Sequence, residues 1–458
     1  MSEVIVEASE GAAVPVYAVL EAKAAGFLEG RRAFVRAFAQ QSEFKGKAGQ
    51  VLTVPDTEGR PERVLFGLGA GGDPMAFRAL PAKLPPGVYR IAQAPGLAAE
   101  QIALAFAIGS YRFDRYKPRT GEPPRLLVEN GMAEDVRRQA HACALARDMV
   151  NTPANDMGPL QIETIAREIA EQFGASITVI AGDGLLEGGY PAVHAVGRAA
   201  AADRSPRMIE IAWGKPAHPL VAIVGKGVTF DTGGLDIKPS SGMRLMKKDM
   251  GGAAHALALG RMIMDAGLPV RLVILVPTVE NAISGSAMRP GDVIASRKGL
   301  SIEIGNTDAE GRLILADALT RAGELEPALT IDLATLTGAA RAALGPQLPP
   351  FYTDDESLAD AIARAAKAVS DPLWRMPLWR PYDEALESDV ADLKNDSDAW
   401  AQAGSITAAL FLQRFAPKGP WAHFDIYAWN PRGKPGSPSG GEAQAIRALY
   451  RVVRERFP

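Results

Sequence analysis

The stretch LVAIVGKG, from Leu220 to Gly227, sets the fold prediction. Leu220–Val224 is a continuous apolar run, and a Gly-Lys-Gly segment follows it. Unbroken apolar runs of this length are typical of strands that are buried on both faces of a sheet. The stretch therefore predicts a buried strand that ends in a glycine-rich loop carrying Lys226.

The same order of strand, loop and helix continues along the chain. The further strands expected are Arg271–Val276, Ser301–Ile304 and Ala328–Leu333, and the helices between them are Gly252–Ala266 and Leu313–Ala322. Continuous apolar strands that alternate with helices indicate an α/β sheet covered on both faces. Sites in such sheets form at the carboxyl ends of the strands. The polar segments GKG, GNTDAEGR and TLTG each follow an expected strand, so we expect them to meet at one edge of one sheet.

The first third of the chain carries no chemical motif. It mixes expected strands at Val51–Val54, Arg63–Leu68 and Leu126–Val128 with a helix at Ala98–Ser110, and Lys117–Pro124 is a break. A helix is expected at Glu134–Val150, and Pro153 and Pro159 stop it from continuing further. We take this helix as the connection between the first third and the rest of the chain. A helix at Leu160–Phe173 and a strand at Ser176–Ile180 come next, and Lys418–Gly441 reads as a loop.

We therefore predict an α/β protein of two domains. Residues 1–131 form a smaller N-terminal α/β domain. Residues 132–458 form a larger catalytic domain with a central mixed sheet flanked by helices, and helix 134–150 is the connector.

Composition excludes several classes of protein. With 47% hydrophobic and 22% charged residues the chain is globular rather than disordered. A net charge of −3 gives no support for nucleic acid as the main partner. No membrane span or signal peptide is expected, and the single cysteine, Cys143, cannot form an intrachain disulfide. We expect a cytoplasmic protein.

Two segments, Val224 to Ala254 and Ile304 to Leu313, hold most of the chemistry. They place four carboxylates and a lysine on loops near strand ends, namely Asp231, Asp249, Asp308, Glu310 and Lys226. Four carboxylates repel one another unless cations balance them, and two divalent ions would do so. A lysine can join as a neutral amine, because metal ions lower its pKa. None of the five histidines forms an HExxH pair, and a carboxylate-rich set suits Mn, Mg, Co or Zn.

Each residue also has an ordinary structural interpretation. Asp308 and Glu310 would stabilise a helix N-terminus, with Asn306 or Thr307 as its cap. Arg312 alone would be a surface or ion-pair residue, Lys247 and Lys248 a solvated pair, and His255 a packed histidine. These separate roles do not explain why charged, glycine-rich loops follow the apolar strands repeatedly.

At this point the sequence resembles the leucyl aminopeptidase family, also called the cytosol aminopeptidases. GNTDAEGRL (Gly305 to Leu313) matches the signature of that family, as does the spacing of Lys226, Asp231, Lys238 and Asp249. The resemblance continues through IDLATLTGA, Ile331 to Ala339, and covers roughly Asn151 to Asp425, while the first third is similar only in position and size.

The resemblance implies a role for each residue. Asp231 and Glu310 would bridge two metal ions, Lys226 and Asp249 would complete one metal site, and Asp308 the other. Lys238 would be the catalytic lysine, and Arg312 would hold a bicarbonate. The substrate pocket would be formed by Met246, Asn306, Thr335, Leu336, Thr337 and Gly338.

The implied reaction is the release of N-terminal residues from peptides. The α-amine would bind one metal ion, and a metal-bound hydroxide would attack the carbonyl. Lys238 would stabilise the oxyanion and the bicarbonate would move the proton. The resemblance also implies two divalent ions per subunit, Mn or Zn before Mg or Co, and a homohexamer.

The chain departs from the family pattern near the pocket. Thr232 replaces a usual serine, Ala403 a usual glycine, and His423–Gly436 (HFDIYAWNPRGKPG) differs from the commoner HLDIAG. The preferred N-terminal residue is therefore not predicted. Two other functions stay open: an accessory DNA-binding role, which the charge does not support, and a metal-binding structural role without catalysis, against which Lys238 and Arg312 argue.

Overall fold

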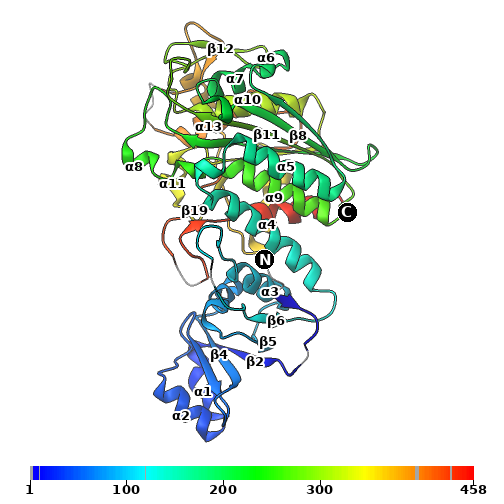
Figure 1. Ribbon diagram of the computed structural model, residues 1–458, viewed down its shortest axis with the longest axis vertical. Coiled ribbons are helices and arrows are strands. Elements are labelled where there is room, and N and C mark those ends of the chain that lie inside the picture. The colour runs from blue at the N-terminus through cyan, green and yellow to red at the C-terminus, as the bar shows by residue number, and fades with distance from the viewer. Residues whose placement is uncertain (1–3, 10, 119, 398–401, 434–435) are drawn as a thin grey trace. The chain divides into compact units, whose positions relative to one another are not determined.

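The computed structural model describes residues 4–9, 11–118, 120–397, 402–433 and 436–458 (Figure 1). The chain divides into two compact units. The first comprises Met1–Ala144 and Arg432–Ser439, and the second Leu145–Pro431 and Gly440–Pro458. The helix expected at 134–150 is α4 (Ala133–Asn151). A domain boundary at residue 131 stays a prediction.

The first unit is built on a six-stranded sheet. Its strand order is β1-β6-β5-β2-β4-β3, with β1 at Ile5–Val6, β6 at Arg125–Leu127, β5 at Val88–Gln93, β2 at Val14–Leu20, β4 at Pro61–Gly69 and β3 at Val51–Pro55. Only the β3–β4 pair is antiparallel. The three strands predicted in this third, and the helix α3 (Ala99–Gly109), are all present. This confirms the small α/β domain.

The second unit contains a nine-stranded mixed sheet. The strands follow the order β16-β15-β18-β14-β9-β11-β8-β7, and β10 pairs with β11. Their bounds are Trp374–Arg375, Pro350–Tyr352, Trp421–Asp425, Leu329–Ala334, Leu220–Gly225, Arg271–Asn281, Arg207–Trp213 and Ser176–Ala181, with β10 at Gly227–Asp231. The middle strands β18, β14, β9 and β11 run parallel, so their carboxyl ends meet at one edge.

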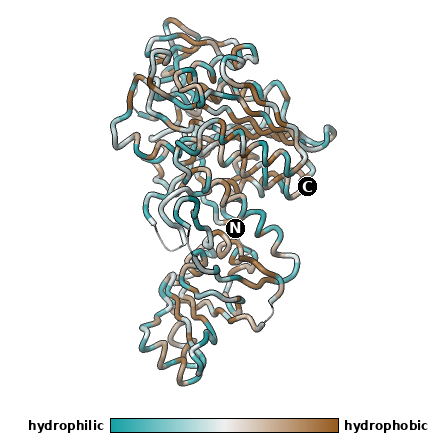
Figure 2. The backbone as a smooth tube through the Cα atoms, viewed as in Figure 1, coloured by the Kyte–Doolittle hydropathy of each residue, from teal (hydrophilic) through white to brown (hydrophobic). Residues whose placement is uncertain are grey.

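Helices cover both faces of this sheet (Figure 1). On one face α9 (Gly251–Asp265) packs on β9, β14 and β11, beside α5 (Pro159–Phe173). On the other face α10 (Glu310–Gly323) packs on β9 and β11 and contacts α7 (Pro191–Gly197) and α13 (Gly404–Gln413). The core between α10 and the sheet includes Val224, Leu275, Leu313 and Phe411. Figure 2 shows the matching band of hydrophobic residues along the central strands.

Two predictions about this unit were wrong. The strand expected at Ser301–Ile304 is β13 (Ser301–Glu303), which belongs to a separate three-stranded sheet with β12 (Val293–Ala295) and β17 (Leu393–Lys394). Only its central residue, Ile302, is buried, so this short strand has a single apolar face and does not suit the centre of a covered sheet.

The second error concerns Lys418–Gly441, which is not one loop. It contains the fully buried strand β18, because the apolar residues Trp421, Ala422, Phe424 and Ile426 precede the part richest in Gly and Pro. Lys434 and Pro435 within that segment lie outside the described residues. Among the helices that the structure describes, none has the length and hydropathy needed to cross a membrane.

Candidate active site

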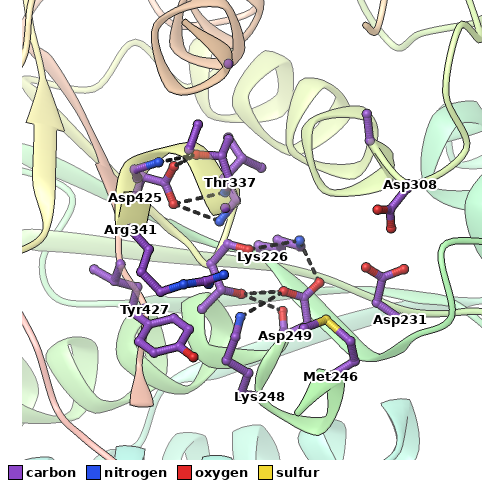
Figure 3. Close-up of a pocket in the computed structure, with 18 of the residues that line it drawn as sticks. Lys226, Asp231, Met246, Lys248, Asp249, Asp308, Thr337, Arg341, Asp425 and Tyr427 are labelled. Atoms are coloured by element: carbon purple, nitrogen blue, oxygen red, sulfur yellow. Dashed lines mark hydrogen bonds and ion pairs between the residues drawn. The ribbon is translucent and has the colours of Figure 1, made fainter. Parts of the chain in front are cut away.

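The carboxyl ends of the parallel strands open into a cavity of about 440 Å³ (Figure 3). Lys226 follows β9 directly, Asp231 ends β10, and Thr335 follows β14. Asp425 ends β18 on the same edge. The central strands run parallel, so their carboxyl ends bring these side chains together. The site therefore lies at the strand ends, where it was predicted.

The structure brings the predicted site residues to this one cavity. Lining it are Lys226, Asp231, Lys238, Met246, Asp249, Asn306, Asp308, Arg312, Thr335, Leu336, Thr337 and Gly338. Glu310 does not line the cavity but lies just behind it, where it is fully buried and pairs with Lys226. The residues from Asn306 to Arg312 arrive from the loop after β13 and the start of α10, and not from the main sheet.

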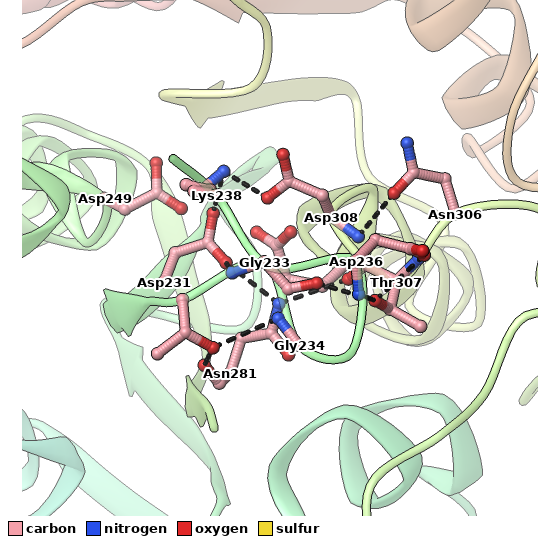
Figure 4. A network of polar contacts seen from close by, with 12 residues as sticks. Asp231, Gly233, Gly234, Asp236, Lys238, Asp249, Asn281, Asn306, Thr307 and Asp308 are labelled. Atoms are coloured by element: carbon pink, nitrogen blue, oxygen red, sulfur yellow. Dashed lines mark hydrogen bonds and ion pairs between the residues drawn. The ribbon is translucent and has the colours of Figure 1, made fainter. Parts of the chain in front are cut away.

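Two lysines link the four carboxylates in pairs. Lys226 Nζ lies 2.6 Å from Asp249 Oδ2 and 3.0 Å from Glu310 Oε1. Lys238 Nζ lies 2.7 Å from Asp231 Oδ2 and also contacts Asp308 (Figure 4). Asp308 is the most accessible member, with 31% of its side chain exposed. Each lysine therefore contacts two carboxylates of the cluster.

The loop after β10 is held by hydrogen bonds to the segment before α10. Asp231 Oδ1 accepts from Gly233 N (2.9 Å) and from Asn281 Nδ2 (2.8 Å). Gly233 has φ +88°, and a Cβ there would lie 2.4 Å from Asp236 O. Thr307 Oγ1 donates to Gly233 O (2.6 Å), so Thr307 braces this loop and is not a helix cap. The β10 carboxylate is thereby fixed relative to Asp308.

Asn395 organises the other side of the cluster and was not singled out from the sequence. It is fully buried, and its Oδ1 accepts from Gly305 N (2.8 Å) while its Nδ2 donates to Asn306 O (2.8 Å). Arg312 Nη1 donates to the backbone oxygen of Asn395 (2.6 Å). The partners of Asn395, Gly305 and Asn306, lie about ninety residues earlier in the chain, so no local pattern indicated these contacts. Asn395 fixes both the signature loop and Arg312.

The carboxylates carry more negative charge than the two lysines neutralise. Burial, together with the charge of Asp231, raises the pKa of Glu310 to about 8 and that of Asp308 to about 6. Burial alone would lower the pKa of Lys226, but Asp249 and Glu310 outweigh it and raise that pKa. Burial would raise the pKa of Asp249, yet Lys226 and Lys248 lower it. Added cations would relieve this repulsion.

The donor set fits divalent cations. Asp231, Asp308 and Glu310 each offer a carboxylate oxygen, and the three oxygens lie within 4.8 Å of one another. Asp249 Oδ2 and Glu310 Oε1 are buried and accept no hydrogen bond of proper geometry from the described residues. Oxygen donors with one amine are the ligands that Mn, Mg, Co and Zn accept. The residues present therefore suit a metal pair.

Arg312 has the properties of an anion site. Its side chain is buried, which lowers its pKa, and Nε has no hydrogen-bond partner among the described residues. A guanidinium with a free edge is suited to a planar anion. Arg312 is 8% exposed and forms no ion pair with a described residue, so its ordinary interpretation as a surface or ion-pair residue is wrong.

The loop after β14 is fixed by two aspartates. Thr335 Oγ1 donates to Asp249 Oδ1 (2.8 Å), which orients this carboxylate. Asp425 accepts from Leu336 N (2.9 Å), Thr337 N (3.2 Å) and Thr337 Oγ1 (2.6 Å). Asp425 was not selected from the sequence, because a single aspartate in a segment taken as a loop carries no pattern. It shapes the wall of the cavity that faces the cluster.

Lys247 and Lys248 are not the solvated pair that was expected. Lys247 Nζ donates to Asn151 O and lies over the Trp429 ring at 5.5 Å. Lys248 is buried and lines the cavity, and burial lowers its pKa. Both lie in the short 3₁₀ segment before α9, which turns one lysine inward. His255 is packed as expected, with Nδ1 near Gly251 O and Nε2 accepting from Gln444 N.

Gly311 makes room for the Lys226 side chain, which leads to a prediction. A Cβ at position 311 would lie 2.5 Å from Lys226 Cε and 2.6 Å from Nζ. We expect Gly311→Ala to displace Lys226, to cost about 1–3 kcal/mol of unfolding free energy and to reduce activity. Gly323→Ala, at the other end of α10, is the control, because its Cβ meets nothing closer than 3.6 Å. Denaturant unfolding and activity assays of both variants test this; equal behaviour would contradict it.

The comparisons with known proteins agree with this geometry. Residues 144–450 match the catalytic domain of the cytosol aminopeptidase family, and residues 14–129 match the M17 aminopeptidase N-terminal domain. A probable cytosol aminopeptidase of Syntrophotalea carbinolica is 43% identical over 402 residues, which cover 83% of this chain and 78% of that protein. Another from Geobacter sp. is 38% identical and covers 91% of each chain.

Two solved structures are similar over nearly their whole length. The crystal structure of cytosol aminopeptidase from Coxiella burnetii shares 43% identity, covers 99% of both chains and has a TM-score of 0.93. The bottromycin maturation enzyme BotP in complex with Mn shares 36% identity, covers 98% of this chain and 100% of its own, and has a TM-score of 0.87.

Fold, site and relatives together define a hydrolase, a metal-dependent aminopeptidase of leucyl aminopeptidase type. The chain belongs to the cytosol aminopeptidase family.

Proposed function

We propose that this enzyme removes N-terminal residues from peptides with the help of two divalent metal ions in the carboxylate cluster. The observation that supports this most is a cavity of about 440 Å³ lined by Lys226 and three of the four carboxylates, with Glu310 buried just behind them. A cluster that only stabilised the fold would have no reason to face a cavity.

Asp231 and Glu310 would be shared by both ions, with Lys226 and Asp249 completing one site and Asp308 the other. Two such ions would supply Lewis acidity toward the scissile carbonyl and the attacking water, and would anchor the α-amine. Mn or Zn suits this donor set best, with Mg and Co as alternatives. The relative BotP was solved in complex with Mn.

Lys238 is proposed to stabilise the oxyanion that develops on the scissile carbonyl. Burial lowers its pKa, but Asp231 and Glu310 outweigh this and raise it, so the ammonium stays charged. A fixed ammonium at the edge of the cavity acts where negative charge appears in the transition state. Lys226 has the opposite task, because it must be neutral to bind metal.

Arg312 is proposed to hold a bicarbonate beside the cluster. Its unpartnered Nε and its buried position support this role. The bicarbonate would supply a base for the reacting water. Asn395 keeps the guanidinium in place through its backbone oxygen.

The function is tested with matched substrates. We expect a metal-loaded preparation to hydrolyse leucine p-nitroanilide but not N-acetyl-leucine p-nitroanilide, because acetylation removes the free α-amine. Chelation should abolish the activity, and added Mn or Zn should restore it. Equal cleavage of both substrates would contradict an aminopeptidase that requires a free α-amine.

Metal uptake should release protons in a pH-dependent way. The pKa of Glu310, raised to about 8, means that this group is protonated at pH 7 without metal and ionised at pH 9. Metal binding at pH 7 must displace this proton as well as the proton of Lys226, whose pKa is raised, so apparent affinity should rise with pH, and more steeply below about pH 8 than above it. Calorimetry in buffers of different ionisation enthalpy should show about one proton fewer released at pH 9 than at pH 7. A constant release would contradict this account of Glu310.

We further propose a cytoplasmic homohexamer, as the family resemblance implies. Light scattering of the purified enzyme checks the assembly, and a monomeric mass would exclude it.

A further inference from the structure

The cavity has a second charged region, across Asp249 from Asp231 and Asp308 (Figure 3). It consists of Lys248, Arg341 and Tyr427, and we call it the basic wall. Lys248 Nζ lies 5.3 Å and Arg341 Cζ 4.7 Å from the centroid of the Tyr427 ring. Two cations therefore sit on one aromatic ring at the edge of the cavity.

Neither cation of the basic wall has a carboxylate of its own. The side chain of Arg341 forms no ion pair or hydrogen bond with any residue that the structure describes. Lys248 is only 5% exposed, and its nearest carboxylate oxygen, Asp249 Oδ1, is 3.6 Å away. Asp249 is already paired with Lys226 at 2.6 Å. Lys248 is thus a buried cation that shares its carboxylate with Lys226, and Arg341 is an exposed cation at the cavity without a counter-ion among the described residues, so an added anion would suit the pair.

The nearby aspartate does not supply that anion. Asp425 lines the same cavity, but its oxygens accept three hydrogen bonds from Leu336 and Thr337. It makes no ion pair with Arg341 within the described part of the chain. An anionic ligand between Lys248 and Arg341 would gain two charge-assisted contacts.

We infer that the basic wall is a subsite for a carboxylate of the peptide substrate. This inference rests on the proposed function, because the α-amine must lie at the neighbouring Asp249 side of the cluster. Two carboxylates of a peptide have this chemistry: the side chain of an N-terminal Glu or Asp, and the C-terminal carboxylate of a dipeptide. Tyr427 fixes the far end of the subsite, in the segment where this chain departs from the commoner family pattern.

The test compares anionic substrates with neutral isosteres. Glutamate p-nitroanilide is paired with glutamine p-nitroanilide, and Leu-Gly with Leu-Gly-amide. We expect kcat/KM of the wild-type enzyme to favour the anionic member of one pair by at least about tenfold. A preference in the first pair assigns the side chain, and a preference in the second pair assigns the C-terminal carboxylate.

Variants connect the preference to the residues. Lys248→Met and Arg341→Met should each bring the ratio toward one. Lys247→Met is the matched control and should leave it unchanged, because Lys247 does not line the cavity and donates to Asn151 O. If Lys248→Met fails to fold, Arg341→Met carries the test, because Arg341 is exposed on the short helix α11 (Gly338–Leu344).

The outcomes separate the inference from the proposed function. Hydrolysis of leucine p-nitroanilide with both ratios near one would overturn the carboxylate subsite and leave the aminopeptidase function standing. A preference that survives both substitutions would also overturn it. Loss of hydrolysis of every substrate by the wild-type enzyme would overturn the two together.

Discussion

Replacing Glu310 by alanine should lower kcat/KM by at least about 10³-fold, because metal ions contribute several kcal/mol to the transition state. Glu310 is 1% exposed, opens helix α10, and lies 3.0 Å from Lys226 Nζ and close to Asp231 and Asp308. With Asp231, it is one of the two carboxylates that we propose are shared by both metal ions. Its removal should therefore disrupt both proposed metal sites at once.

The Glu310 experiment measures metal content as well as rate. We expect Glu310→Ala to bind less metal per subunit by mass spectrometry. Glu324→Ala is the control: it removes a carboxylate from the opposite end of the same helix, where Glu324 pairs with Arg297 and Arg321 near the surface. That change should have little effect on either readout. Full metal content and wild-type kcat/KM in Glu310→Ala would refute the bridging role.

Replacing Lys238 by methionine should reduce kcat about 10²–10³-fold while the metal content stays close to that of the wild-type enzyme. Lys238 contacts Asp231 and Asp308 at the cavity edge, but it is proposed to act on the substrate and not to bind metal. The loss should fall on kcat more than on KM, because the charge is needed only as the oxyanion develops.

Lys226→Met provides the contrast to Lys238→Met. Lys226 is buried between Asp249 and Glu310, so its replacement should reduce metal binding and activity together. The two variants should therefore differ in metal content. Lys238→Met should lose activity but keep its metal, whereas Lys226→Met should lose both activity and metal. If both variants lose metal equally, Lys238 is a structural counter-ion and its catalytic role is wrong.

The sequence was sufficient for the elements whose patterns are local. Leu220–Val224 is apolar throughout and Arg271–Val276 is apolar after its first residue, and each forms a strand buried on both faces. The place of Lys226 at the edge of the sheet also followed from the sequence, because Lys226 directly follows such a strand. The position of a site residue can be predicted from the sequence where the residue directly follows a strand that is itself predictable.

The failures concern features that only tertiary structure decides. Ser301–Glu303 was predicted as a strand, but the sequence of this segment does not determine which sheet it joins. Lys248 belongs to a charged pair that is solvated in most proteins, and only the 3₁₀ turn before α9 directs it into the cavity. Asn395 lies more than eighty residues from the loop that it holds, so its contacts with Gly305 and Asn306 left no trace in the local pattern.

The separate sheet that contains β13 bears on how catalysis can be tuned. Asp231 is carried by the large sheet, whereas Asp308 and Glu310 follow β13 of the small one. The gap between them is set by how α10 rests on β9 and β11, through buried residues such as Leu313 and Val224. A change of one methyl group in that apolar layer would shift Asp308 and Glu310 relative to Asp231 without altering any of the three residues. Variation in turnover among related enzymes should therefore also map to the underside of α10, where a sequence comparison limited to the ligands would find nothing.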